Sequence, residues 1–424
     1  MREMKDSGIE WIGTIPKNWK LLRIQYGLYE IKENNTLKKT SQVLSLVKDN
    51  GVMLYEDKGN KGNKSKEDIS QYKIAYPNTL IVNSMNILIG SVGISKYTGC
   101  VSPVYYVFKE TEQTDLRFIN YIFNTREFQK ELRKFANGIL EIRLRVSAND
   151  IFRRKIPFPD RQTQKVIADF LDRKCSEIDA LTADIQTQID TLEEYKKSVI
   201  TEAVTKGLDH NAEMKDSGVE WIGKIPKHWL ITKLKRFCYF KTGTTPKTSN
   251  PLWFDGSLKW YTPSDFSENY ILEDSSRTLT YKAKQDNVAT IIPKNTVIII
   301  GIGGTAGKIG LTVEECSCNQ QLTAIISQHV HHKYLMYWMV ANSCFLKETA
   351  LYTTLPIINN RTLAEYLLIF PEDLSEQIKI SDYLDNKCIE IKKIISEKRQ
   401  QLETLAEYKK SLIYEYVTGK KEVA

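Results

Sequence analysis

The sequence "MKDSGIEWIGTIPKNW" occupies residues 4–19, and a near copy, "MKDSGVEWIGKIPKHW", occupies residues 214–229. Thirteen of the sixteen positions are identical, and the copies begin 210 residues apart. An internal repeat decides the architecture of a chain, so it is interpreted before any single motif. We call these segments the first and second signature. Their spacing predicts a chain built from two halves of nearly equal length.

A second repeated pair lies towards the end of each half. "EEYKKSVITEAVT" (193–205) matches "AEYKKSLIYEYVT" (406–418), and "FLDRKCSEID" (170–179) matches "YLDNKCIEIK" (383–392). The offset is 213 residues for both matches. Each half therefore consists of a signature, a variable block of about 140 residues and a stretch of about 40 residues with helical character.

The two repeated stretches carry a heptad pattern of apolar residues and contain neither Pro nor Gly over 163–205 and 375–417. A sustained heptad predicts helices that pack along their length. At about 1.5 Å per residue, each helix would be about 60 Å long. If the helices pair, chain order makes them antiparallel, which brings the C-terminus back towards the N-terminus and places both signatures at helix ends. The predicted helix-pairing residues are Leu171, Ile178, Ile185, Leu192, Val199, Leu384, Ile391, Leu405 and Leu412.

The variable blocks have a different pattern. Runs such as "VLSLV" and "NTVIIIGIGG" predict strands separated by Gly, Asn, Ser and Pro turns, and each block contains one helical patch. We expect an α+β fold in which two globular α/β domains are separated by two long antiparallel coiled-coil helices with a pseudo-two-fold internal repeat. The predicted segments are 1–160 (first block with its signature), 161–209 (central helix), 210–372 (second block with its signature) and 373–424 (C-terminal helix).

Composition narrows the functional class. The 424 residues carry a net charge of +8, which favours polyanionic partners such as nucleic acid. The longest apolar run, near residue 300, is far shorter than the ~20 residues needed to span a bilayer, so we expect a cytoplasmic protein without a membrane partner. None of the seven cysteines forms a C-x-x-C pair, which favours reduced thiols and no metal site.

Several phrases together resemble the specificity subunit of type I restriction-modification enzymes. They are "DSGIEWIGTIPKNW", "FKTGTTPKTSNPLWFDGSLKWYTPSDF" (240–266) and "LDRKCSEID" with "EEYKKSVITEAVTKG", and the resemblance covers essentially the whole chain. It implies two target-recognition domains that each read one half of a split double-stranded DNA site. It also implies that the paired helices set the gap and bind two modification (methyltransferase) subunits, which restriction subunits then join. One small departure is that the first copy ends "VTKG" (204–207) where the second ends "VTGK" (417–420).

The predicted helices are compatible with this geometry, since half-sites in symmetric DNA complexes lie about 34–36 Å apart. Because the blocks differ in sequence, the half-sites should differ as well. Lys and Arg anchor phosphates, whereas Asn, Gln, Ser, Thr and Arg read base edges. Solvated charged loops remain an alternative for each candidate. The candidate DNA-binding residues are Lys58, Lys61, Lys64, Lys66, Arg143 and Arg145 in the first block and Lys235, Arg236, Lys241, Thr244, Thr245, Lys247, Thr305, Lys308, Asn319 and Gln320 in the second.

Two further motifs have alternative interpretations. The sequence "GIGGTAGKIG" (301–310) imitates a nucleotide loop but matches neither a dinucleotide fingerprint nor a P-loop, so we expect a glycine hairpin near DNA. The "YKKS" copies on the helices are either an exposed helical face or, as the resemblance implies, contacts with modification subunits. The candidate interface residues are Tyr195, Lys196, Lys197, Tyr408, Lys409 and Lys410.

We find no methyltransferase Asn-Pro-Pro-aromatic loop, no acidic nuclease cluster and no helicase P-loop in the sequence. The chain is therefore expected to be a non-catalytic recognition subunit that binds no cofactor itself. S-adenosylmethionine, ATP and Mg²⁺ are expected on the partner subunits. Two alternatives are a coiled-coil scaffold without a DNA role and a nucleotide-binding enzyme that uses the 301–310 loop.

Overall fold

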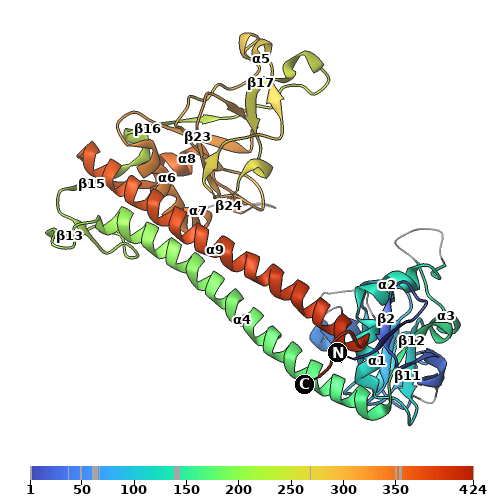
Figure 1. Ribbon diagram of the computed structural model, residues 1–424. Coiled ribbons are helices and arrows are strands. Elements are labelled where there is room, and N and C mark those ends of the chain that lie inside the picture. The colour runs from blue at the N-terminus through green and yellow to red at the C-terminus, as the bar shows by residue number, and fades with distance from the viewer. Residues whose placement is uncertain are drawn as a thin grey trace. The chain divides into compact units, whose positions relative to one another are not determined.

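The computed structural model describes residues 2–36, 38–47, 50–59, 65, 67–137, 144–267, 269–348, 351–352 (backbone only) and 356–423. It divides into two compact units (Figure 1). Unit 1 comprises Met1–Gln186 and Arg399–Ala424, and unit 2 comprises Thr187–Lys398. Each unit thus contains one variable block together with one end of each long helix.

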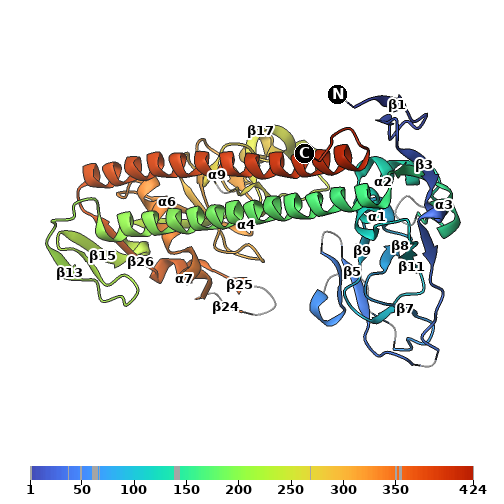
Figure 2. The same ribbon diagram turned by 60° about the horizontal axis from the view of Figure 1, so that its bottom comes forward.

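The two long helices are α4 (Arg161–Lys206) and α9 (Leu374–Val417). Within unit 1 the Phe170 ring lies 4.5 Å from the Tyr416 ring, and Lys409 Nζ lies 2.5 Å from Asp179 Oδ1. Residue numbers thus rise along one helix as they fall along the other. The unit 1 segments of the two helices run side by side in Figure 2, so the predicted antiparallel pair is confirmed there.

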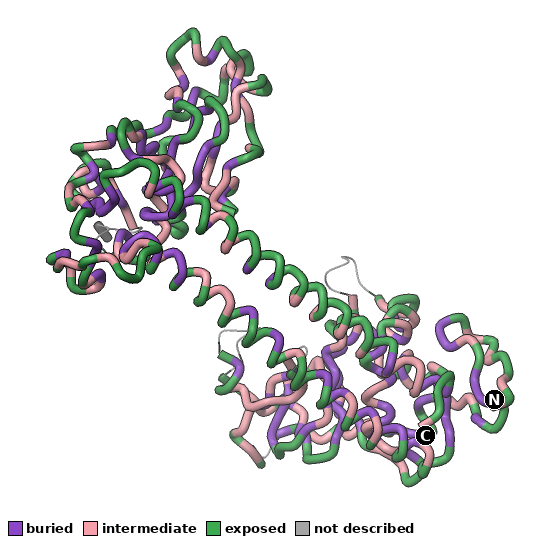
Figure 3. The backbone as a smooth tube through the Cα atoms, turned by 60° about the vertical axis from the view of Figure 1, so that its left-hand side comes forward, coloured by how far each residue is buried: buried purple, intermediate pink, exposed green. Residues whose placement is uncertain are grey.

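Buried positions recur among exposed ones along both long helices, which Figure 3 colours by burial, and we call the apolar heptad positions among them the seam. Leu192 and Leu405 are half-buried. The other predicted pairing residues are buried: Leu171, Ile178, Ile185, Val199, Leu384, Ile391 and Leu412. Because the seam also contacts each block, the helices form part of the hydrophobic core of both units.

The block of unit 1 is built on an antiparallel four-stranded sheet of order β4-β11-β8-β9. Helices α1 (Leu116–Phe123) and α2 (Arg126–Arg133) bury Phe118, Phe123 and Phe128 in the core. The remaining helix of the block is α3 (Ala148–Arg153). The strands are β1 (Met4–Asp6), β2 (Thr14–Pro16), β3 (Lys20–Arg23), β4 (Leu28–Glu30), β5 (Leu44–Val47), β6 (Gly51–Leu54), β7 (Lys73–Ala75), β8 (Leu80–Asn83), β9 (Val92–Ile94), β10 (Gly99–Val101), β11 (Tyr105–Glu110) and β12 (Lys155–Phe158).

The block of unit 2 has a five-stranded sheet of order β16-β23-β20-β21-β18, in which only the β18–β21 pair is parallel, and a three-stranded sheet of order β19-β17-β22. Its strands are β13 (Met214–Asp216), β14 (Lys224–Pro226), β15 (Trp229–Lys233), β16 (Cys238–Thr242), β17 (Phe254–Tyr261), β18 (Ile271–Leu272), β19 (Thr278–Leu279), β20 (Val297–Ile300), β21 (Ile309–Thr312), β22 (Ser317–Cys318), β23 (Leu322–Ser327), β24 (Leu351–Tyr352), β25 (Pro356–Ile357) and β26 (Leu367–Pro371). Its helices are α5 (Tyr281–Gln285), α6 (His332–Ala341), α7 (Ser343–Glu348) and α8 (Asn360–Glu365).

Each block begins and ends on one short ladder. In unit 1, β3 pairs antiparallel with β12, and in unit 2, β15 pairs antiparallel with β26. Because β12 and β26 directly precede α4 and α9, each ladder closes the block where its helix begins. The signature, the ladder and the long helix therefore form a repeated frame, and each variable block is inserted into it.

Candidate nucleic-acid interface

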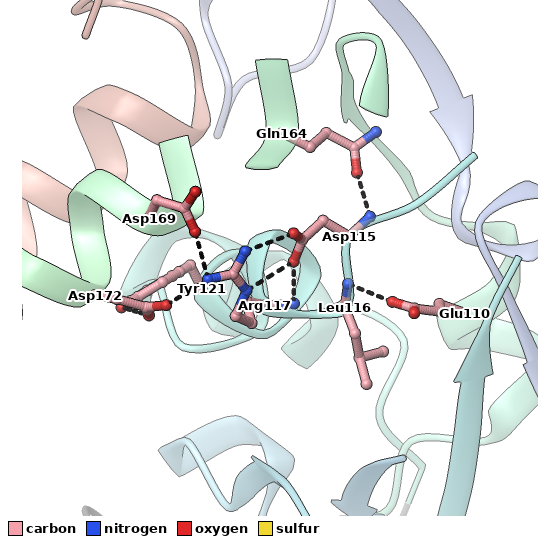
Figure 4. Close-up of polar contacts among 8 residues, drawn as sticks. All are labelled: Glu110, Asp115, Leu116, Arg117, Tyr121, Gln164, Asp169 and Asp172. Carbon is pink, nitrogen blue, oxygen red and sulfur yellow. Dashed lines mark hydrogen bonds and ion pairs between the residues drawn. The ribbon is translucent and has the colours of Figure 1, made fainter. Parts of the chain in front are cut away.

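A buried glutamine joins the block of unit 1 to the first turn of α4 (Figure 4). Gln164 Oε1 accepts from the backbone N–H of Asp115 at 3.0 Å, and its Nε2 donates to the carbonyls of Pro159 (2.9 Å) and Gln113 (3.2 Å). Gln164 is fully buried, so each of these bonds replaces one to water. The bonds fix α1 on the beginning of α4.

Arg117, in the first turn of α1, strengthens this join. Its guanidinium contacts Asp115 at 2.8 Å, Asp169 at 2.7 Å and Asp172 at 2.8 Å, as Figure 4 shows. The hydrogen bond with Asp115, followed by that with Asp169, raises the pKa of Arg117. Tyr121 donates to Asp172 at 2.7 Å, and burial followed by this bond raises the pKa of Tyr121. We call Gln164, Arg117 and Tyr121 with their partners the first anchor.

Unit 2 repeats the arrangement at the beginning of α9. Gln377, also fully buried, accepts from the N–H of His331 at 2.7 Å and donates to the Pro371 carbonyl at 2.8 Å. Lys333 Nζ lies 2.5 Å from Asp385, and Tyr337 donates to the same carboxylate at 2.7 Å. We call Gln377, Lys333 and Tyr337 with their partners the second anchor.

The signatures pack against helix ends, as the sequence predicted. In unit 1, Lys420 Nζ donates to the Ile12 carbonyl at 2.6 Å, and in unit 2, Lys206 Nζ donates to the Ile222 carbonyl at 2.8 Å. Ile12 and Ile222 occupy equivalent signature positions. The exchange of "KG" for "GK" therefore leaves the lysine with the same acceptor in both halves.

The block of unit 2 contains a polar hollow of about 410 Å³. Its lining includes Gln320, Gln321, Asn360 and Arg361. Asn360 Nδ2 donates to the hydroxyl of Thr242 at 3.1 Å. Amide, hydroxyl and guanidinium groups are those that recognise base edges, so this hollow is the strongest candidate for base reading in unit 2.

Sequence analysis found only part of this hollow. It selected Gln320 but missed Asn360 and Arg361, although "IINNRT" (357–362) offered a signal in its adjacent amide and guanidinium side chains. Thr245 lies beside it, since its hydroxyl hydrogen-bonds to Gln320. Asn319, by contrast, is buried and its side chain bonds to Gln321, so its predicted base-reading role does not fit this placement.

The other candidate DNA-binding residues in and around β16 are exposed. Lys241 lies in β16 and Lys247 in the loop that follows it, whereas the Thr244 hydroxyl donates to the Val288 carbonyl at 3.1 Å. Lys235 is held by Glu365 at 2.6 Å. Arg236 is exposed and forms no ion pair within the described ranges.

Thr305 and Lys308 do not join these residues around the polar hollow. Both are exposed on the loop between β20 and β21, and Lys308 lines a different hollow beside α4. The antiparallel pairing of β20 with β21 confirms the predicted glycine hairpin. Its Ala306, Gly307 and Lys308 N–H groups bond to the hairpin's own carbonyls, which argues against a phosphate-cradling nucleotide loop.

In unit 1, several predicted contacts cannot be placed, because Lys61, Lys64, Lys66 and Arg143 lie outside the described residues. Lys58 was expected on an open loop, but it is buried, and its ammonium lies 4.1 Å from the centre of the Tyr55 ring. It lines a hollow of about 360 Å³ together with Asn83 and Asn86. Arg145 is exposed, and its backbone pairs with Asn137 in an isolated bridge.

The "YKKS" copies differ in one contact. Tyr195 and Tyr408 are both exposed, and Lys197 and Lys410 each pair with the glutamate three residues earlier. Lys409 crosses to Asp179 of the other helix, whereas the Lys196 ammonium lies 5.3 Å from the Tyr270 ring. The exposed tyrosines are available to a partner protein.

Each unit thus carries a distinct α+β block anchored on a pair of antiparallel helices, which defines an internally duplicated recognition scaffold. The family described as "Type I restriction modification DNA specificity domain" matches residues 16–191 and 226–404, so the chain belongs to this family. It is a specificity subunit of the type I restriction-modification class.

Curated relatives agree with the family match. The type I restriction enzyme MjaVIII specificity subunit of Methanocaldococcus jannaschii is 25% identical over 366 residues, which is 80% of each chain. The MjaIX specificity subunit of the same organism is 29% identical over 192 residues, but that match spans only 42% of the relative and 43% of this chain.

Solved structures share the fold. A chain from a study of complex assembly and conformational transition of the type I R-M system has a TM-score of 0.74 at 13% identity, covering 96% of this chain and 99% of that one. The HsdS subunit from Thermoanaerobacter tengcongensis has a TM-score of 0.54 at 13% identity, covering 96% and 98%. Separately, no helix in the described part of the chain combines the length and apolar character needed to cross a membrane.

Proposed function

We propose that each block reads one half of a split, asymmetric site in double-stranded DNA. The observation that carries the proposal is the repeated anchor: the same buried glutamine and tyrosine–aspartate bonds hold two different blocks on one helical frame. The polar hollow lined by Gln320, Asn360 and Arg361 supports base reading in unit 2. Differences between the blocks then specify two different half-sites.

The long helices set the spacing between half-sites and dock two methyltransferase subunits, which restriction subunits join. Exposed apolar side chains on a helix mark a protein-binding surface. Leu374, Ile378 and Ile389 of α9 are exposed and recur at spacings of four and eleven residues, which place them on one helix face. Catalysis and the binding of S-adenosylmethionine, ATP and Mg²⁺ belong to the partner subunits.

The direct test is methylome sequencing of cells that express this chain together with its cognate methyltransferase subunit. Cells with the methyltransferase subunit alone are the control. A split adenine-methylated motif that requires this chain supports the proposal. A stable complex with no new motif contradicts it and favours a scaffold without a DNA role.

Block exchange sharpens the test. Residues 20–158, which include both strands of the closing ladder, are replaced by the block of another family member. One half of the methylated motif should change while the other half is retained. A change in both halves would contradict modular reading.

A further inference from the structure

Unit 2 contains a second hollow, of about 450 Å³, which the DNA-reading proposal does not use. Its walls come from α4, the glycine hairpin and the corner between α6 and α7. The lining is mostly apolar, and we call its apolar residues Ile200, Ile309, Val340 and Phe345 the apolar floor. A volume between about 300 and 1,000 Å³ with an apolar lining is typical of small-molecule sites.

The equivalent helix position in unit 1 is occupied by a larger side chain. Thr201 lines the hollow, whereas the repeat places Tyr414 at the matching position of α9. Tyr414 is partly buried against the unit 1 core, and its hydroxyl donates to the Trp11 carbonyl at 2.9 Å. The hollow therefore accompanies a small side chain in one half of the repeat.

Charge at the rim favours an anion. Four lysines line the hollow against one carboxylate, Glu193. Lys197 is paired with Glu194. Lys308 and Lys347 are exposed, and neither forms an ion pair with any residue that the structure describes. Two lysines at the edge of an apolar floor suit a ligand with a negative group at one end.

We propose that this hollow binds a small organic anion with a flat apolar body. The body lies on Phe345 and Ile200, and the anionic group faces Lys308 and Lys347. The hairpin N–H groups are already bonded within the loop, so the site offers ammonium groups and not a backbone cradle for a polyphosphate. The proposal is independent of which DNA sequence the chain recognises.

Titration of the full chain with the fluorescent aromatic sulfonate anilinonaphthalene sulfonate tests the proposal. We expect one saturable site in the wild-type protein. Thr201→Tyr, which introduces the side chain of the other half, should abolish binding. Lys308→Gln with Lys347→Gln should weaken binding at least about tenfold, since each removes a charge-assisted contact. Lys282→Gln with Lys294→Gln, an equal charge loss outside the hollow, should leave the affinity unchanged.

Cys344 supplies a second readout, because it is exposed and lines the same hollow. A probe concentration that just saturates the wild type should slow alkylation of Cys344, measured by mass spectrometry, more in the wild type than in the lysine double variant. The proposal is overturned by the absence of saturable binding, by equal binding in all variants or by an unprotected Cys344. Displacement of the probe by the purified methyltransferase subunit would also overturn it, by assigning the hollow to a protein segment.

Discussion

The first and second anchors both hold a helix of the block on a long helix, but they use different numbers of carboxylates. Both place a tyrosine four residues after a basic residue on the block helix, Arg117 with Tyr121 and Lys333 with Tyr337, and both use a buried glutamine on the long helix. Arg117 bonds three carboxylates, whereas Lys333 bonds one. The comparison teaches that the join between block and helix is kept while the rest of the block varies.

The signatures show a second difference. Trp229 Nε1 donates to Glu376 at 3.0 Å, whereas the buried Trp19 Nε1 has no hydrogen-bond partner among the described residues. The residue matching Glu376 in the first half is Thr163, which bonds to Asp160 instead. The two signatures therefore share a backbone arrangement, but within the described part of the chain only the second has a hydrogen bond from its buried tryptophan to the long helix.

Removal of the anchor glutamines gives the largest expected effect. Gln164→Ala should lower the free energy of unfolding by about 3–5 kcal/mol, because each buried group left unbonded costs about 1–3 kcal/mol. Gln377→Ala should cost less, since Gln377 makes two of these side-chain bonds and Gln164 makes three. Urea denaturation followed by circular dichroism measures both. An equal or reversed order would contradict our ranking of the anchors.

Substitution of the glycine that follows each long helix should destabilise the two units by different amounts. Gly419 has φ +71°, and a Cβ there would lie 2.5 Å from Pro16 Cδ, whereas at Gly207 (φ +74°) the nearest atom would be Trp229 Cζ2 at 3.2 Å. Left-handed backbone costs a non-glycine residue about 1–2 kcal/mol, and overpacking adds about 1–3 kcal/mol. Gly419→Ala should therefore destabilise by about 2–4 kcal/mol and Gly207→Ala by about 1–2 kcal/mol.

Thermal melting of the two glycine variants, with Gly304→Ala as a control in open space, provides the measurement. The control should melt close to the wild type, because an added Cβ at Gly304 meets nothing within 4 Å. If Gly207→Ala were as damaging as Gly419→Ala, close packing against the first signature would not be the cause.

The two long helices differ in the surface that we propose for methyltransferase docking, because α9 has an exposed apolar residue where α4 has a polar one. Ile389 is 66% exposed, and the matching residue of α4 is Ser176. Ile389→Ser should weaken one of two methyltransferase binding steps by about tenfold, since burial of such a side chain contributes about 1.5–3 kcal/mol. Ser176→Ile is the converse variant. Isothermal titration that shows both binding steps unaffected would exclude this face from docking.

The smallest effect concerns the ladder in unit 2. Hydrogen bonds from Lys233 and then Lys235 lower the pKa of Glu365 from 4.5 to about 2, whereas the matching position before β12 is Arg153. A depressed pKa stabilises the fold above pH 4.5, and this contribution is lost as pH falls from 4.5 towards 2. Because the pair is exposed, the effect should be slight and salt-sensitive. Glu365→Gln should melt with a shallower decline than wild type between pH 5 and pH 3.

The frame was predictable from the sequence because it is written twice. The helical segments were predicted at 161–209 and 373–424, and the helices lie at Arg161–Lys206 and Leu374–Val417. The anchor glutamines were missed, although Gln164 and Gln377 sit 213 residues apart in otherwise different sequences. That identity was a usable signal.

The candidate site was predicted less well, because tertiary packing decides the exposure of a loop residue. Lys58 and Asn319 have the composition of surface contacts, yet both are buried. Asn360 and Arg361 reach the polar hollow from a helix that begins about 40 residues after Gln320. No local pattern brings those segments together, so only the folded chain reveals their neighbourhood.

The contact of the first signature with the end of α9 affects the order in which the two units fold during synthesis. Tyr414 and Trp11 are separated by 403 residues, whereas unit 2 is a continuous stretch that ends at Lys398. Contacts of such long sequence separation form slowly, and domains made earlier on the ribosome fold first. Unit 2 can therefore complete its core while unit 1, although started first, still waits for residues 399–423. A ribosome that stops near residue 398 releases one finished unit and one open unit.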